Sequence, residues 1–182
     1  YMNTYGARSG GASMYDAAET FFACGGSELV VQRASGPSAV LSTITLDSKI
    51  VVTSRWPGAY YDAFTATYTH TTTTLTIVKP SVTVTYVGAT AAALQAAASV
   101  DPDVTVTVSA LPSGTHGPTA LASGADDYAN VVWATVLGKI TPAVGPGCIA
   151  APGVNAAAAA LASHAYSNRR LALLTPVQTD SA

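Results

Sequence analysis

Hydrophobic and polar positions alternate along the middle of the chain in a pattern typical of β-strands. Over much of the stretch from Phe64 to Tyr86, apolar residues alternate with threonine. Successive side chains of a strand point to opposite faces of its sheet, so this period of two predicts half-buried antiparallel strands. Further β-type runs occupy 40–46, 49–53 and 104–108, and residues 89–98 have the composition of a short helix.

The N-terminal part has helical periodicity instead. Ser13 and Asp16 have the spacing of a capping box, which predicts the start of a helix. The apolar positions that follow at helical spacing are Met14, Ala18, Phe21 and Phe22. We expect a helix over 13–24, with at least one of the two phenylalanines anchored in a core.

A glycine pair is expected to end this helix, because glycine adopts the left-handed conformation of a helix C-terminus at little cost. The pair is Gly25-Gly26, and the apolar run at residues 29–33 follows it directly. This order predicts a helix, a glycine turn and then a buried strand.

The C-terminal third has the pattern of alternating helices and strands. Residues 111–125 are rich in proline, glycine and serine and are expected to form a connection. Ser123 and Asp126 repeat the capping-box spacing, which predicts a helix that continues through Thr135 to Gly138. The segments expected after it are a buried strand at 146–152, an alanine-rich helix at 154–166 and a strand at 170–174.

Helix, strand, helix and strand in this order are typical of βαβ units with parallel strands. We therefore expect an α/β fold, with helices packed on a mostly parallel sheet and with a β-rich antiparallel insertion. The expected segments are 1–48 and 119–182 for the two parts of the α/β domain and 49–118 for the insertion.

The composition excludes some classes of function. Only 10% of the 182 residues are charged and the formal net charge is −2, so the chain has no basic surplus with which to bind nucleic acid. No apolar stretch is long enough for a transmembrane helix. The surface must instead present many of the 35 alanines and 24 threonines, either to water or to other subunits of an assembly.

Residues able to carry chemistry are scattered. His70, His116 and His164 have no metal-ligand spacing, and the only two glutamates are Glu19 and Glu28. Asp126-Asp127 is expected at a helix start, where acidic side chains favour the helix dipole. A hydrolase would have to use Ser163, His164 and Asp180, and the chain has no GxSxG motif. We expect no catalytic residue, no cofactor-binding residue and no metal site.

The chain has two cysteines, and they do not form a CxxC motif. Cys24 lies at an expected helix end and Cys148 in an expected buried strand. These positions predict two buried free thiols, while a disulfide between the two cysteines remains the alternative.

Three segments have motifs whose order spans nearly the whole chain. The first runs from Tyr15-Asp16-Ala17-Ala18 through Phe21-Phe22 and Gly25-Gly26 to residues 29–33. The second is Arg55-Trp56-Pro57-Gly58-Ala59. The third comprises residues 121–128, then 149–153, the alanine-rich helix and 169–176. In this order they resemble the contractile tail sheath proteins of bacteriophages. Tyr60-Tyr61-Asp62 stands where that family has Trp-Gly-Asn.

The resemblance implies a structural subunit and not an enzyme. Many copies would polymerise helically around a tail tube, and the sheath would shorten to drive the tube through a host envelope. The implied partners are neighbouring sheath subunits, the tail tube protein, the baseplate and the tail terminator. The implied location is the virion tail, assembled in the host cytoplasm, where structural disulfides are rare and both cysteines would be free.

The resemblance also implies that the chain is a core fragment, without the terminal arms and C-terminal domain that link neighbouring subunits. Such a fragment is expected to be a monomer on its own. Tailocins and secretion systems use similar sheath subunits, and the sequence does not separate them from a phage. The threonine-rich alternation supports an alternative, a β-rich virion decoration or adhesin module.

Overall fold

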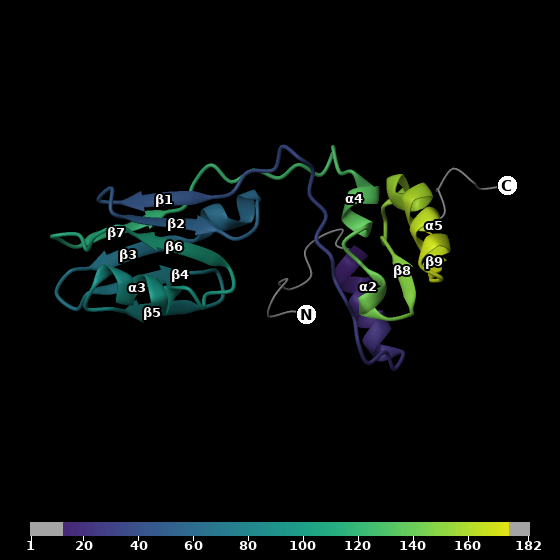
Figure 1. Ribbon diagram of the computed structural model, residues 1–182, viewed down its shortest axis with the longest axis horizontal. Coiled ribbons are helices and arrows are strands. Elements are labelled where there is room, and N and C mark those ends of the chain that lie inside the picture. Colours follow the sequence, from purple (N-terminus) through teal and green to yellow (C-terminus); the bar gives the residue numbers. More distant parts are fainter. Residues whose placement is uncertain (1–12, 175–182) are drawn as a thin grey trace. The chain divides into compact units, whose positions relative to one another are not determined.

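The chain forms two compact units in the computed structural model, which describes residues 13–174 (Figure 1). Ser35–Asn130 is one continuous unit, called here the β-rich unit. The split unit combines Tyr1–Ala34 with Val131–Ala182. The boundaries expected from the sequence, at 48/49 and 118/119, both fall inside the β-rich unit.

The β-rich unit, which the structure describes in full, contains two antiparallel sheets (Figure 1). The first has the order β1-β2-β6, with β1 at Thr43–Leu46, β2 at Ile50–Ser54 and β6 at Val104–Val108. The second has the order β5-β4-β3-β7, with β3 at Thr65–Thr69, β4 at Thr74–Val78, β5 at Thr83–Val87 and β7 at His116–Ala120. The 3-10 helix η1 spans Ala59–Ala63, and the helix α3 spans Ala91–Ala98.

Short connections explain why these strands pair antiparallel. Leu46 of β1 pairs with Ile50 of β2 across a tight turn in which Asp47 and Ser48 have φ angles of 49° and 52°. A parallel pair needs a crossover of a dozen or more residues, and such turns leave no room for one. The alternating residues from Phe64 to Tyr86 form β3, β4 and β5, as the sequence predicted.

One hydrophobic core is shared by the two sheets of the β-rich unit. It includes Ile50 and Val52 of β2 and Ala66 and Tyr68 of β3, all fully buried. The other buried members are Leu46, Tyr61, Phe64, Leu75, Ile77, Tyr86, Leu94, Ala98, Val104, Val106, Val108 and Leu121. The helix α3 contributes Leu94 and Ala98 and contacts both β5 and β6. It therefore contacts one strand from each sheet.

The threonines of the strands lie on the faces of the sheets that point away from this core. Thr67, Thr76 and Thr85 pair in one row across β3, β4 and β5. Thr43 and Thr53 pair likewise, with an Oγ1–Oγ1 distance of 3.2 Å. The period of two along each strand thus places apolar residues inside and threonine outside.

The segment expected to be a plain connection, residues 111–125, contains the strand β7, which pairs with β3. Beyond β7 the chain runs antiparallel to the start of the unit. Val40 and Ala125 exchange two backbone hydrogen bonds, of 2.9 and 3.1 Å, and the Gly36 N–H donates to the Asp127 carbonyl at 2.7 Å. The entry and exit of the β-rich unit are therefore paired with each other.

The same pairing overturns the helix expected to start at Ser123. Ser123 has a φ of 68°, which is not a right-handed helical conformation, and α4 spans only Trp133–Leu137. Asp127 does not head a helix. Its carboxylate accepts the Ser38 N–H at 3.0 Å and a hydrogen bond from Asn130 at 2.7 Å. Gly138 ends α4, as expected.

The split unit contains short elements around a small core. Within the residues described, they are α2 (Ser13–Ala23), α4, η2 (Pro142–Val144), β8 (Cys148–Ala150), η3 (Asn155–Ala157), α5 (Ala158–Ser167) and β9 (Leu171–Leu173). The strands β8 and β9 pair in parallel, with α5 between them in the chain, so this βαβ unit forms as predicted. Leu161 and Ala165 of α5 and Ile149 of β8 belong to its buried core.

Near the N-terminus, the predicted helix is confirmed, and Gly25 ends it with a φ of 88°. The expected core anchor is wrong, because Phe21 and Phe22 are 37% and 46% exposed. Ala18 of α2 is buried, and the Phe21 ring packs against Gly26. The strand expected at 29–33 is absent, because these residues pair with no other strand.

The expected fold class is contradicted for the chain as a whole. Two of the three sheets in the part that the structure describes are antiparallel, and the parallel sheet has only the two short strands β8 and β9. The order of helices and strands at the C-terminal end predicted a local unit correctly. That unit does not extend into a larger parallel sheet, since 29–33 adds no strand and 123–132 adds no helix.

Candidate functional site

A buried group of charged and polar side chains stands out in the β-rich unit, where the core is otherwise apolar. Lys79, just after β4, places its Nζ 2.8 Å from Asp101 Oδ1 and 2.7 Å from Asp103 Oδ2. The Tyr86 hydroxyl of β5 donates to Asp101 Oδ2 at 2.5 Å. The Lys79 and Asp101 side chains are buried, and Asp103 is partly exposed.

Backbone groups complete this arrangement. Asp101 Oδ1 also accepts the N–H groups of Asp103, at 2.8 Å, and Val104, at 3.2 Å. The Phe64 ring lies on another side of the lysine, with its centroid 6.0 Å from Nζ. The carboxylate of Asp101 is thus fully hydrogen-bonded, which is the condition under which a buried charge is tolerated.

The pKa values in this group follow from burial and pairing, which act in opposite directions. Burial alone would raise the pKa of Asp101, but hydrogen bonds from Lys79 and Tyr86 outweigh it and hold the pKa below 3.8. Burial alone would lower the pKa of Lys79, but its two carboxylate partners hold it above 10.5. Burial and the bond to Asp101 raise the pKa of Tyr86.

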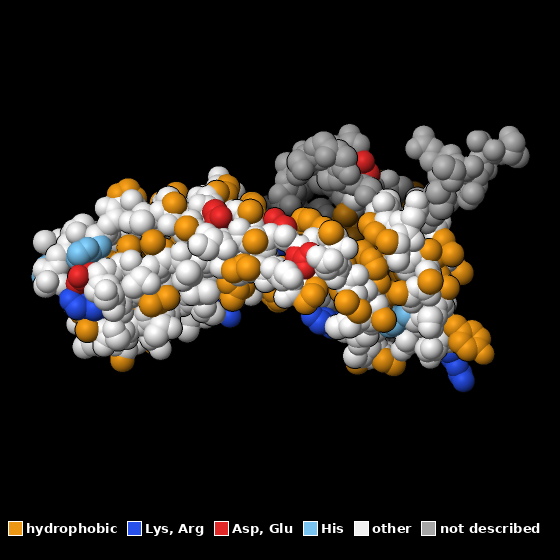
Figure 2. Space-filling view, turned by 90° about the horizontal axis from the view of Figure 1, so that it is seen from above, with side chains coloured by type: hydrophobic (Ala, Val, Ile, Leu, Met, Phe, Trp, Pro, Cys, Tyr) orange, Lys and Arg blue, Asp and Glu red, His pale blue; other side chains and the backbone are white. Residues whose placement is uncertain are grey.

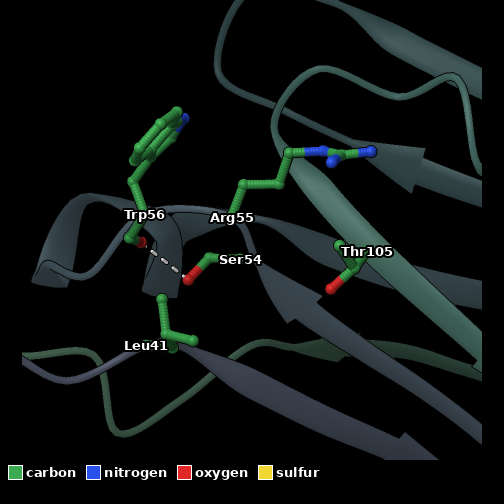
Figure 3. Close-up of a pocket in the computed structure, with 5 residues that line it drawn as sticks. All are labelled: Leu41, Ser54, Arg55, Trp56 and Thr105. Atoms are coloured by element: carbon green, nitrogen blue, oxygen red, sulfur yellow. Dashed lines mark hydrogen bonds between the residues drawn. The ribbon is translucent and has the colours of Figure 1, made fainter.

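A shallow hollow lies on the surface of the β-rich unit near Trp56 (Figure 3). Its lining residues are Leu41, Ser54, Arg55, Trp56 and Thr105. The Ser54 hydroxyl donates to the Trp56 carbonyl at 2.9 Å and accepts the Ser42 N–H, so its hydrogen-bonding capacity is used within the fold. The hollow has no pair of groups arranged as nucleophile and base.

Arg55 in this hollow also has a structural role. Its Nε donates to the Asp101 carbonyl at 2.8 Å, and its Nη2 donates to the Ser99 carbonyl at 3.0 Å. The guanidinium group therefore ties the end of α3 to β2. Trp56 is 53% exposed and extends from the hollow as an apolar surface residue.

The three histidines are not brought together. His70 Nδ1 lies 2.9 Å from the Pro112 carbonyl, and His116 Nε2 lies 3.8 Å from Asp47 Oδ2 in the β-rich unit. His164 lies on α5 in the split unit, and its Nε2 is buried without a hydrogen-bond partner. Ser163 is an exposed neighbour of His164, and Asp180 lies outside the described residues.

The cysteines correct one expectation and agree with another. Cys24 and Cys148 are both free, as the sequence predicted. Both are exposed, whereas the sequence predicted buried thiols. Cys148 lies on the face of β8 opposite Ile149, because alternate residues of a strand point to opposite sides.

Charged side chains are few and scattered on the face shown in Figure 2, among uncharged polar atoms and hydrophobic patches. Between residues 13 and 174, no group of three metal-ligating side chains is placed together. Over the same residues, no helix has the length and apolar character needed to cross a bilayer. Comparisons with protein-family models, with curated proteins and with solved structures give no match for this chain.

Sequence reasoning missed the buried polar group formed by Lys79, Tyr86, Asp101 and Asp103, called here the Lys79 group. Lys79 precedes a proline and lies among β-type residues, and Asp101-Pro102-Asp103 precedes the strand β6. Each charge taken alone has the appearance of a surface turn residue. The available signal was that a chain with only 10% charged residues places a lysine directly after the alternating threonine and apolar residues of β4.

Proposed function

We propose that the chain is a structural subunit of a contractile tail sheath, which polymerises around a tail tube and shortens to drive it through a host envelope. The proposal rests on the sequence motifs that resemble those of the tail sheath family, and one structural observation supports it. A β-rich unit interrupts the split unit, and its entry and exit are hydrogen-bonded to each other from Gly36–Asp127 to Thr43–Ala122. This is the organisation of an insertion in a host domain.

The surface composition is in keeping with a subunit of an assembly. The sheets of the β-rich unit present uncharged threonine, and the split unit exposes large apolar residues on its strand β9. Leu171 and Leu173 of β9 are 60% and 51% exposed. Parallel sheets are normally covered on both faces, so we expect a neighbouring subunit to cover this face.

Immunogold labelling of particles that carry this sequence would test the proposal. We expect antibodies against the recombinant protein to decorate a contractile tail along its whole length, and to decorate a shorter length after contraction. Labelling restricted to the head, to fibres or to the baseplate would contradict a sheath.

Charge substitutions would test the proposed contact face. Leu171→Asp together with Leu173→Asp should prevent tail assembly, because each subunit contact would then bury carboxylates without partners. Val87→Asp is the matched control, since Val87 is an equally apolar and 63% exposed strand residue of the β-rich unit. Normal tails in the double variant would exclude β9 from the subunit contact.

A β-rich virion decoration or adhesin module is the second candidate. The observation in its favour is that the β-rich unit has its own core and two antiparallel sheets. The same labelling experiment separates the two candidates, because a decoration protein would label the head surface or the fibres.

A further inference from the structure

The Lys79 group has the composition and geometry of a reaction site as well as of an ion pair. Replacing a buried ion pair by apolar residues is often neutral or stabilising, so stability alone does not account for burying Lys79 and Asp101. Four further groups converge on the pair, namely the Asp103 carboxylate, the Tyr86 hydroxyl and the backbone N–H groups of Asp103 and Val104.

We propose that Lys79 and Asp101 form an intramolecular isopeptide bond between Nζ and Cγ. The structure shows the reactants side by side. Nζ is 2.8 Å from Oδ1, and a C–O bond adds about 1.2 Å at most, so Nζ lies within about 4 Å of Cγ. Reacting atoms held this close, with their side chains fixed by packing, approach a near-attack arrangement.

The surrounding groups match the needs of amide formation. Asp103 Oδ2, 2.7 Å from Nζ, is placed to accept a proton from the amine as a general base. The two backbone N–H groups on Oδ1 are placed to stabilise the negative charge that develops there when Nζ attacks. The Tyr86 hydroxyl holds Oδ2, the oxygen that would leave.

The step balances without any other reactant. Nζ begins with three protons and the Asp101 carboxylate with none. The Nζ–Cγ bond forms and the Cγ–Oδ2 bond breaks. Two of the Nζ protons move, through Asp103, to Oδ2, which departs as water, and the third remains on the amide nitrogen.

Amide formation would remove two buried charges. Burial by itself opposes the charged forms of both side chains, and the hydrogen bonds between Lys79, Asp101, Asp103 and Tyr86 keep both side chains charged before the bond forms. The new bond would join the residue after β4 to the residues before β6. It would therefore connect the two sheets of the β-rich unit covalently, whatever assembly the chain belongs to.

Mass spectrometry of the folded, purified protein tests the proposal directly. We expect the denatured intact mass to be lower than the sequence mass by one water. A chymotryptic digest should contain a branched peptide that joins the segments containing Lys79 and Asp101. A protein that is folded by circular dichroism and has the full sequence mass would overturn the proposal.

Variants distinguish this bond from other losses of water. Lys79→Met and Asp101→Ala should restore the full mass even if they weaken the fold, because each removes one reactant. Asp103→Asn should leave most of the protein at full mass, since the base is lost. Lys49→Met, which removes the partly exposed Lys49–Asp47 pair at 2.6 Å, is the control that should keep the deficit. A deficit that survives Lys79→Met would assign the lost water to another residue and overturn the bond.

Discussion

The two units of the chain bury very different amounts of apolar side chain. Among the residues described, the core of the β-rich unit has sixteen buried members, drawn from both sheets and from α3. The core of the split unit has five, two of them alanine. Since stabilisation follows buried apolar area, the β-rich unit should supply most of the stability of the chain.

The largest effect is expected from truncating the core of the β-rich unit. Phe64→Ala removes a fully buried ring that contacts Tyr60 and Tyr61. It should lower the free energy of unfolding by about 3–5 kcal/mol, measured by urea denaturation. Phe22→Ala in the split unit is the control and should cost less than about 1 kcal/mol, because this ring is largely exposed. Equal losses would mean that Phe22 of α2 is packed as tightly as Phe64.

A smaller and more local effect is expected in the split unit. Leu161→Ala removes the largest buried side chain of α5 and should cost about 2–3 kcal/mol, at the low end for leucine because a small core relaxes easily. Amide hydrogen exchange should become faster in α5 and β9 and remain unchanged in β3 and β4. Faster exchange in both units would show that they unfold together, which would contradict separate stabilities for the two units.

Steric crowding gives a test within the β-rich unit. A Cβ at Gly88 would collide with the backbone of Leu94, so Gly88→Ala should destabilise by about 1–3 kcal/mol as α3 is displaced. Gly114→Ala is the control, since the nearest atom to its Cβ would be His116 Nε2 at 3.9 Å. Thermal melts of the two variants should separate clearly, and equal midpoints would place α3 away from Gly88.

The smallest effect concerns the paired ends of the β-rich unit. Two hydrogen bonds to the carboxylate lower the pKa of Asp127 below its ordinary 3.8. The larger contribution comes from the backbone N–H of Ser38 and the smaller from the side chain of Asn130. A carboxyl with a lowered pKa contributes stability that is present above the unfolded value and is lost as the pH falls through the folded value. Acidification below about pH 4 should therefore loosen this pairing, seen as faster exchange of the Gly36 and Val40 amides.

Asp127→Asn supplies the comparison for this pH dependence. The variant should show weakened protection of the same amides at neutral pH and a smaller further loss on acidification, because no carboxylate remains to be protonated. If the variant and the parent lose protection equally between pH 6 and pH 3, Asp127 does not control the pairing.

Local patterns predicted the elements whose partners are near in sequence. The alternation in Phe64–Tyr86 predicted β3, β4 and β5, and the capping box with the glycine pair predicted α2. The alanine-rich segment and its flanking apolar runs predicted α5 between β8 and β9. These elements depend on side-chain period, on capping and on short turns, all of which are properties of neighbouring residues.

The tertiary structure decided what depends on distant partners. Residues 116–120 became β7 because β3 offers them an edge, and residues 122–127 stayed extended because residues 36–43 pair with them. The burial of Lys79 beside Asp101 and Asp103 likewise required the end of β4 to meet the start of β6. The sequence by itself determined which segments favour helix or strand. Which strand pairs with which, and which charges are buried, followed only from packing, because hydrogen bonds and desolvation act between residues that the chain brings together from far apart.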